Sequence, residues 1–264
     1  MPVTRNHSIW MTCLLPFLLL LSCPVYAEMS LSEKSLPADT VIKDTFQAGD
    51  GLPVGKIQTV RGEINIFHRD PSVGYRAETG LPLYLGDTLQ TRKDSHILFR
   101  LVDGSRLAMA PGTRLTVLQA NVNSARKSSR SSLTLKKGGA RFYINPRPDF
   151  SVFEFRVQTE IASVQAQAAD FVIKAGPENT EIATFENSRL EVTSLAEPNE
   201  INFLSDYQRT VITEQSVAPA VETVSAADAD ELMAEFSFVP AGKFTASSAT
   251  DLKSDNIIEE NLGN

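Results

Sequence analysis

The chain has 264 residues, a formal net charge of −7 at pH 7 and only 2 cysteines. The charge is unevenly distributed: residues 28–213 carry 22 acids and 22 bases, whereas residues 214–264 carry 10 acids and 2 bases. A neutral body with an acidic tail lacks the basic footprint of a nucleic-acid-binding protein, so we expect no nucleic-acid partner.

The first 27 residues have the layout of a secretory signal peptide. One base, Arg5, precedes the apolar run Ile9–Leu21, and small residues close the segment at Ala27. The run is shorter than the roughly 20 residues that span a bilayer, and Pro16 interrupts it. We therefore predict that residues 1–27 are a cleaved signal peptide and that the mature chain is periplasmic or secreted.

Two processing sites fit this segment. Cleavage after Ala27 has the usual small-residue layout, and we prefer it. Leu20–Cys23 instead has the order of a lipobox, in which Cys23 would become an acylated N-terminus, and we expect contact with a membrane only in that case. Cys13 and Cys23 both lie in the leader, so cleavage after Ala27 leaves no thiol for a disulfide or a cysteine metal site.

A linker and a β-rich body are predicted next. Residues 28–51 are polar without periodicity, which indicates a linker or an ordered lead-in. Residues 52–213 contain short runs in which apolar and polar residues alternate, separated by turn residues such as Asp103-Gly104. Alternation gives a strand one buried and one wet face. Many short strands about ten residues apart predict an all-β fold, either a sandwich or a β-solenoid.

Two stretches lack this alternation. Residues 121–132 are small, polar and basic, and we predict a solvated loop there. The acidic tail, 214–264, has little to bury, and we predict that it is largely disordered, with a short helix over 225–236 that Ser225 caps.

The turn residues of the body follow a recognisable order. They are Gly86, Asp87 and Thr91, then Asp103, Gly104 and Ser105, then Gly138 and Gly139, and finally Thr159 and Phe171. In this order, residues 54–195 resemble the periplasmic FecR-type domain. The resemblance implies a solenoid-like or sandwich-like stack of short strands with hairpin turns, and a role in contacts with partners rather than in chemistry.

The resemblance has two departures. Residues 167–170 read Gln-Ala-Ala-Asp where the family has a basic residue, Gly and Thr before the aromatic strand. The regulator that names the family also has a sigma-factor-controlling cytoplasmic segment and a membrane span before this domain. Only about eight residues precede the apolar run here, so we do not expect control of a sigma factor to carry over.

No group of residues predicts catalysis, a cofactor or a metal. Asp87, Asp103 and Asp170 could pair for glycoside hydrolysis, which needs two carboxyl groups about 5 to 10 Å apart, but turn chemistry explains the first two better. His68 and His96 lack a neighbouring Cys or His at ligand spacing, and we interpret both as surface histidines.

A basic cluster is the most local charge feature of the body. It consists of Arg126, Lys127, Arg130, Lys136 and Lys137. It could bind an anionic partner, such as a polysaccharide, a phospholipid head group or the protein's own acidic tail. The alternative is an ordinary solvated hairpin loop, which we prefer.

Together these observations predict a non-catalytic, exported FecR-type protein with a binding or scaffolding role in the bacterial cell envelope. Its partner would be an envelope protein or a polysaccharide, recognised through exposed strand edges or end loops. Two alternatives stay open. One is a periplasmic signalling component that works through a separate membrane partner, and the other is a carbohydrate-active envelope enzyme.

Overall fold

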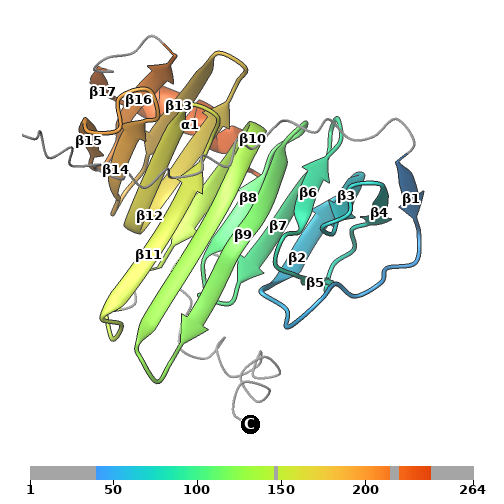
Figure 1. Ribbon diagram of the computed structural model, residues 1–264. Coiled ribbons are helices and arrows are strands. Elements are labelled where there is room, and N and C mark those ends of the chain that lie inside the picture. The colour runs from blue at the N-terminus through green and yellow to red at the C-terminus, as the bar shows by residue number, and fades with distance from the viewer. Residues whose placement is uncertain (1–39, 146–147, 215–219, 239–264) are drawn as a thin grey trace, which may run out of the picture. The chain divides into compact units, whose positions relative to one another are not determined.

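The computed structural model describes residues 40–145, 148–214 and 220–238, and it confirms the all-β prediction (Figure 1). These ranges contain 17 strands and one helix. The helix is short, and no helix among the described residues is long and apolar enough to cross a membrane. The predicted signal peptide, residues 1–27, lies outside the described residues.

The strands follow one another with short connections. They are β1 (Val41–Lys43), β2 (Gly55–Arg61), β3 (Ile64–Phe67), β4 (Val73–Arg76), β5 (Pro82–Leu83), β6 (Thr88–Thr91), β7 (His96–Leu101), β8 (Arg106–Met109), β9 (Arg114–Asn123), β10 (Ser128–Ile144), β11 (Val152–Gln158), β12 (Ala162–Ala175), β13 (Asn179–Thr184), β14 (Arg189–Ser194), β15 (Ile201–Leu204), β16 (Gln208–Thr213) and β17 (Val221–Thr223). The helix α1 spans Ala226–Ala234.

The strands form two layers that share their two longest strands. The first sheet has the order β1-β4-β3-β6-β9-β10-β11-β12-β14-β15. The second has the order β5-β2-β7-β8-β10-β12-β13-β16-β17. The early halves of β10 and β12 pair in the first sheet and their late halves in the second. Most pairs are antiparallel, but β1–β4 and β10–β11 are parallel.

The passage of β10 between the sheets corrects one expectation. We predicted a hairpin turn at Gly138-Gly139, but β10 continues through both glycines for 17 residues. Gly138 has a φ of +87°, and a Cβ there would overlap Thr113. The glycine therefore bends the strand from one sheet into the other, where a side chain would be strained and crowded.

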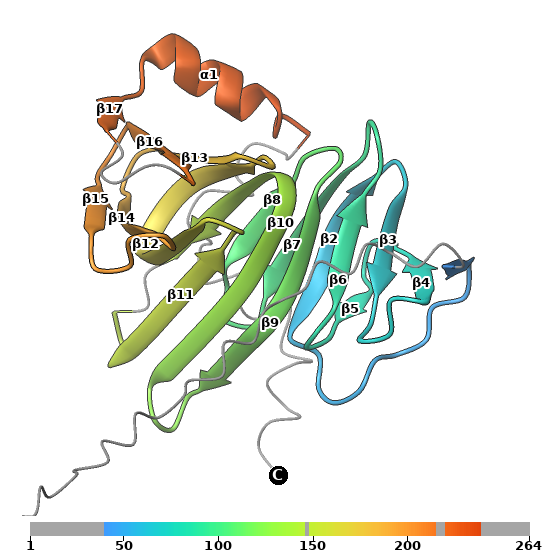
Figure 2. The ribbon, with the colours of Figure 1, turned by 45° about the horizontal axis from the view of Figure 1, so that its top comes forward.

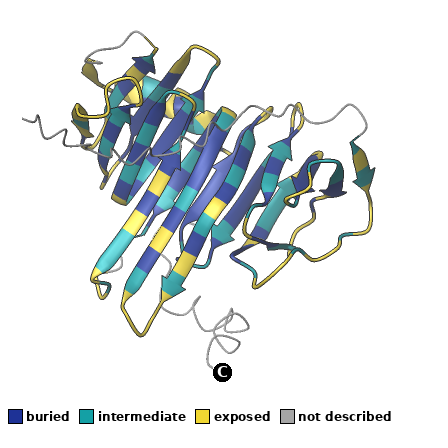
Figure 3. Cartoon of the chain, viewed as in Figure 1, coloured by how far each residue is buried: buried dark blue, intermediate teal, exposed yellow. Residues whose placement is uncertain are grey.

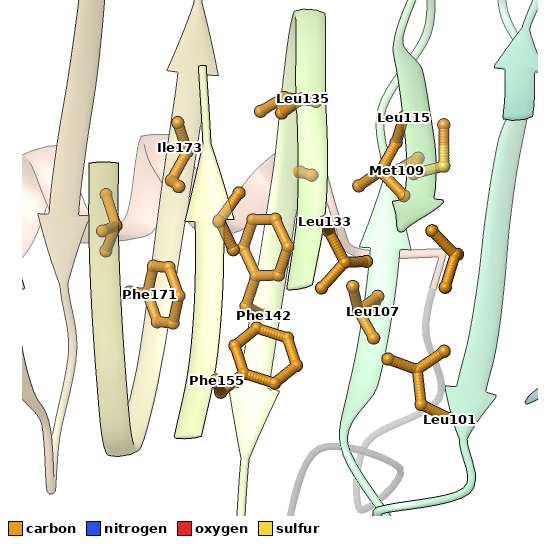
Figure 4. Close-up of a cluster of buried hydrophobic side chains, with 14 of the residues drawn as sticks. Leu101, Leu107, Met109, Leu115, Leu133, Leu135, Phe142, Phe155, Phe171 and Ile173 are labelled. Carbon is orange, nitrogen blue, oxygen red and sulfur yellow. The ribbon is translucent and has the colours of Figure 1, made fainter. Parts of the chain in front are cut away.

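The core lies between the two sheets, where the alternating apolar residues meet. Phe142 and Phe171 stack with ring centroids 4.9 Å apart, and Phe155 meets Phe142 edge to face at 6.3 Å. Figure 4 shows these rings beside leucines from β8, β9 and β10. All three phenylalanines are fully buried, so the alternation in the sequence correctly identified the inner face.

A second, smaller apolar cluster lies on the outer face of the second sheet, beneath α1 (Figure 2). Leu232 and Phe236 are buried there against Leu98, Val172 and Phe185 of the sheet. We predicted residues 214–264 to be largely disordered with a short helix over 225–236; α1 lies within that helix, and residues 220–238 as a whole are ordered as β17 and α1 and cover this face. Apolar side chains on the outer face of the sheet provide the complementary surface that the tail's own composition does not reveal.

The helix in this segment begins as its sequence indicated. Ser225 is the N-cap, and its Oγ accepts a hydrogen bond from the backbone N–H of Asp228 at 3.2 Å. Lys174 then donates to Glu235, just after the helix, at 2.7 Å. Residues 239–264 of the predicted disordered tail lie outside the described residues.

Candidate functional site

His68 and Asp87 form a partly buried pair near the edge of the first sheet. The Nδ1 of His68 forms a hydrogen bond with Oδ1 of Asp87 at 2.7 Å, and its Nε2 lies 2.8 Å from the carbonyl oxygen of Gln47, which accepts from it. The other carboxylate oxygen of Asp87 accepts the N–H of Tyr84 at 2.8 Å. The His68 side chain is only 19 % exposed, so our interpretation of a surface histidine was wrong.

Three aromatic rings surround this histidine. Phe46, Tyr75 and Tyr84 have ring centroids 5.7, 5.1 and 5.8 Å from that of His68. We call these three rings with His68, Asp87 and Gln47 the His68 centre. The sequence signal was present but dispersed, because the rings come from three segments that the sheet brings together.

The contacts of His68 limit which atoms donate and which accept in the His68 centre. Both ring nitrogens of His68 face acceptor oxygens, and a neutral imidazole has only one N–H to donate. The carbonyl oxygen of Gln47 can only accept, so Nε2 is the donor in that contact, whereas the donor in the contact between Nδ1 and Asp87 depends on the tautomer. Burial raises the pKa of Asp87 above its usual value, although the hydrogen bonds with His68 and Tyr84 oppose this increase.

The His68 centre fastens the segment before β2 to the body. Gln47 accepts at its backbone from His68 and at its side chain from the Tyr75 hydroxyl, 3.0 Å away. β1, in the same segment, extends the first sheet by pairing with β4. Within the predicted linker 28–51, the described residues 40–51 thus form an ordered lead-in.

The remaining turn residues of the FecR-type pattern serve local structure. Asp103 is buried, accepts the N–H of Ser105 at 2.8 Å and accepts the hydroxyl of Ser131. Thr91 accepts the N–H of Thr113 at 2.8 Å, and Thr159 accepts that of Ala162 at 3.0 Å.

The two glycine turns of the pattern have a backbone role. Gly86 and Gly104 have φ values of +89° and +91°, in the left-handed region that favours glycine. These two glycines of the pattern therefore allow the chain to turn at positions where other residues would be strained.

Residues 167–170, which depart from the FecR-type pattern, include Asp170, which forms an ion pair. It forms a bidentate ion pair with Arg141, at 2.8 and 2.7 Å, and the Arg141 guanidinium lies 5.2 Å from the centroid of the Phe185 ring. The aspartate at this position is thus bound to a cross-strand arginine on the outer face of the second sheet.

Each of the three candidate carboxylates has hydrogen-bond partners other than a second carboxylate. His68 and Tyr84 engage Asp87, the β7–β8 turn and Ser131 engage Asp103, and Arg141 engages Asp170. Within the described ranges, no group of three or more His, Cys, Asp or Glu side chains could hold a metal ion.

The predicted basic loop is mostly strand. β9 continues to Asn123 and β10 starts at Ser128, so only residues 124–127 turn, and the exposed tip of this hairpin is visible in Figure 3. The loop prediction failed because polar side chains also suit strands that extend beyond the core.

The five basic residues therefore do not share one loop. Arg126 and Lys127 lie at the hairpin tip, whereas Lys136 and Lys137 lie about ten residues further along β10, roughly 30 Å away at strand rise. Arg130 pairs with Glu154 at 3.1 Å and Lys136 with Glu160 at 3.7 Å. The distance between these basic residues along the strand and their ion pairs with glutamates both weaken the case for a concentrated anion site.

A shallow groove lies at the end of the second sheet, beside the end of α1. It has a volume of about 590 Å³, and Pro111, Gly139, Lys174 and Glu235 are among its lining residues. Its lysine forms the ion pair with Glu235 described above, so the groove does not present an isolated charge to a ligand.

The edge of the first sheet at β15 has an unpaired side and exposed apolar side chains. In the described chain, β15 pairs with β14 alone, so its other side has backbone groups available for a further strand. Ile201 is 49 % exposed and Phe203 63 % exposed. The sequence analysis named strand edges in general as recognition surfaces, but it did not identify this one.

The edge could not be found from the alternation of residues 201–204 alone. Ile-Asn-Phe-Leu reads as an ordinary buried strand with a single polar position. Only the sheet order shows that β15 is the last strand, with no described strand beyond it.

Comparisons with known proteins give one family and a distant structural likeness. Residues 87–188 match the sequence model of the family described as FecR protein. A search of curated proteins found no match. Two crystal structures of a candidate anti-sigma factor from Parabacteroides distasonis ATCC 8503 are similar, at 17% and 16% identity and a TM-score of 0.42 each. Each match covers 53% of this chain and 60% of the crystallised chain, less than two thirds of its length.

Proposed function

Residues 87–188 of this chain are a FecR-type domain, and on that premise we propose that the protein is a non-catalytic binding protein of the bacterial cell envelope. One observation carries the proposal. The carboxylates and the histidine that could perform chemistry are used in hydrogen bonds within the fold, while the open backbone and exposed apolar groups lie at a sheet edge.

Location in the envelope is part of the same proposal. The layout of residues 1–27 supports export, and the charge balance of residues 28–213 gives no support for a nucleic-acid partner. Lipidation at Cys23 would tether the protein to a membrane, whereas cleavage after Ala27 would release it. The intact mass of the mature chain distinguishes the two.

The test is crosslinking in living cells, followed by purification of the full chain under denaturing conditions. We expect a defined envelope protein or polysaccharide to be recovered. Peptidoglycan alone would identify a wall-binding module within the same proposal. Turnover of a glycan that is lost in Asp87→Asn or Asp170→Asn would contradict the non-catalytic assignment.

A signalling role is the second candidate, and the match to the FecR protein family favours it. In that case the domain would transmit the state of one envelope partner to a separate membrane protein. Co-purification with a transmembrane protein would support this role.

A further inference from the structure

We propose that the β15 edge binds an extended segment of another protein, one whose apolar residues are flanked by lysine or arginine. This inference rests on the proposed binding function and names its surface and the chemistry of its partner. Strand addition to an open sheet edge derives affinity from backbone hydrogen bonds and specificity from alternate side chains.

The apolar part of the surface lies on the outer face of the first sheet. Ile201 and Phe203 are two residues apart, so both point to this face, beside Thr193 and Glu191 of β14. Leu204 points inward and is fully buried. An added strand would thus place two alternate residues next to exposed apolar groups, where they would remove Phe203 from water.

The charged part of the surface is mainly acidic, although the exposed Arg189 of β14 lies at its Leu204 end. Glu191, Glu197, Glu200 and Asp206 flank β15, and none of them forms an ion pair among the described residues. Asp206 accepts a hydrogen bond from the backbone N–H of Ser188 at 2.7 Å, so its carboxylate is held in place at one end of the strand. Glu197 and Glu200 are exposed at the other end.

These charges select the partner. Basic residues at both ends of an added segment would meet Glu197 and Glu200 at one end and Asp206 at the other, which favours encounter and fixes register. A segment flanked by acids would be repelled at both ends.

The same charges disfavour a second copy of this chain as the occupant. Two antiparallel copies of Ile201–Leu204, paired about their centre, would bring Glu200 of each close to Asp206 of the other. Acidic residues at a strand edge are also a common device against edge-to-edge association. We therefore expect the β15 edge to bind a basic segment of another protein rather than a second copy of this chain.

The test uses the mature full-length chain and two synthetic peptides. Both contain the segment Val-Thr-Phe-Thr-Val, flanked in one by two lysines on each side and in the other by two glutamates. Binding is measured by calorimetry at low and high salt. We expect the basic peptide to bind and the acidic peptide not to bind, with affinity falling as salt screens the flanking charges.

Variants locate the site. Phe203→Ser should weaken binding of the basic peptide by about tenfold or more, as expected for an exposed aromatic anchor. Glu197→Lys with Glu200→Lys should weaken it by a similar factor and remove most of the salt dependence. Val211→Ser is the matched control, because Val211 is 44 % exposed but lies on β16, and it should change nothing.

Three results would overturn the inference: equal binding of both peptides, unchanged binding in Phe203→Ser, or formation of a dimer in sedimentation at micromolar concentration. Crosslinking in cells separates this inference from the proposed function. If an envelope partner is still captured by Phe203→Ser, the binding function stands and the β15 edge is not its site.

Discussion

The two ends of the first sheet differ in the described residues: one holds a buried polar cluster and the other exposes a large aromatic side chain. At one end, the last described strand is β1, which pairs with β4 alone and leaves Val41 56 % exposed, and the His68 centre fastens the lead-in through Gln47. At the other end, β15 leaves exposed Ile201 and Phe203 between acidic residues. Buried polar contacts are concentrated at the first end, which we call the closed end, and the larger exposed apolar side chain, Phe203, lies at the second, which we call the open end.

The conspicuous polar residues at the closed end have a structural role. Asp87 and His68 would attract attention in a search for a reaction centre, yet their hydrogen bonds hold a segment of the chain in place. Burial of such a pair is costly unless its bonds are satisfied, which explains why the centre contains so many partners. We expect the closed end to be sensitive in stability and the open end to be sensitive in binding.

The largest expected effect is at the closed end. Asp87→Ala leaves the Nδ1 of His68 and the N–H of Tyr84 without their acceptor, and we expect the free energy of unfolding to fall by about 3 kcal/mol. Chemical denaturation measures this. Asp87→Asn keeps one oxygen for the N–H of Tyr84 and should lose less. An unchanged midpoint in Asp87→Ala would mean that the His68 centre contributes no stability.

The cover of the second sheet should be nearly as sensitive. Phe236 is 1 % exposed in the cluster beneath α1, and Phe236→Ala should cost about 3 kcal/mol through the cavity that it leaves. Met233→Ala, at the margin of the same cluster, should cost less. Equal and small losses for both variants, measured by thermal unfolding, would show that α1 contributes little to the fold.

The N-cap of α1 gives a smaller effect. Ser225→Ala removes the acceptor for the N–H of Asp228, and we expect a loss of about 1 kcal/mol. Ser225→Asp retains an acceptor and adds a negative charge at the helix N-terminus, so it should restore the stability. Hydrogen exchange across residues 226–234 is the direct measurement, and equal exchange in all three proteins would contradict this cap.

The pH dependence of stability tests the contact between β7 and the C-terminal segment. The ring of His96 lies 4.7 Å from that of Phe238, and burial, with a contribution from Arg61, lowers the pKa of His96, while Asp94 and Glu235 oppose this. Because the folded pKa lies below the unfolded value of 6.5, the unfolded chain binds this proton first as the pH falls. Stability from His96 is thus present above the unfolded pKa and is lost as the pH falls through the folded pKa.

His96→Phe isolates this contribution, because all other titrating groups are shared with the parent chain. Melting temperatures measured between about pH 8 and pH 5 should fall less in the variant than in the parent. If the two curves run parallel, the contact of His96 with Phe238 does not depend on protonation.

The smallest effect on stability is expected at the open end. Phe203 is 63 % exposed, so Phe203→Ser should change the free energy of unfolding by less than about 0.5 kcal/mol. If the free energy of unfolding is nearly unchanged, a loss of binding in the same variant cannot be attributed to unfolding. A loss above about 2 kcal/mol would show that Phe203 is part of the core in solution.

Local patterns explain which parts of this structure could be predicted. The alternation that buries Phe142, Phe155 and Phe171 is local in sequence, as are the Asp103-Gly104 turn and the Ser225 cap, and all are visible in a few consecutive residues. The all-β class followed from these patterns.

The rest depends on contacts between distant segments. The His68 centre joins residues up to 41 positions apart, from Phe46 to Asp87, and no short window contains it. Gly138 looked like a hairpin turn because the same positive φ also allows a strand to bend between sheets. The β15 edge depends on which strand comes last, a property of the sheet order rather than of any residue.

The central claim, that recognition takes place at the open end, is tested most directly by a photo-crosslinking residue placed in β15. Asn202 is replaced by the photoreactive residue in cells, and Lys127 at the hairpin tip receives the same replacement as a control. The account predicts a crosslink from position 202 to another protein, within a segment whose apolar residues are flanked by lysine or arginine. A crosslink from position 127 alone, or from position 202 to a second copy of this chain, would contradict it.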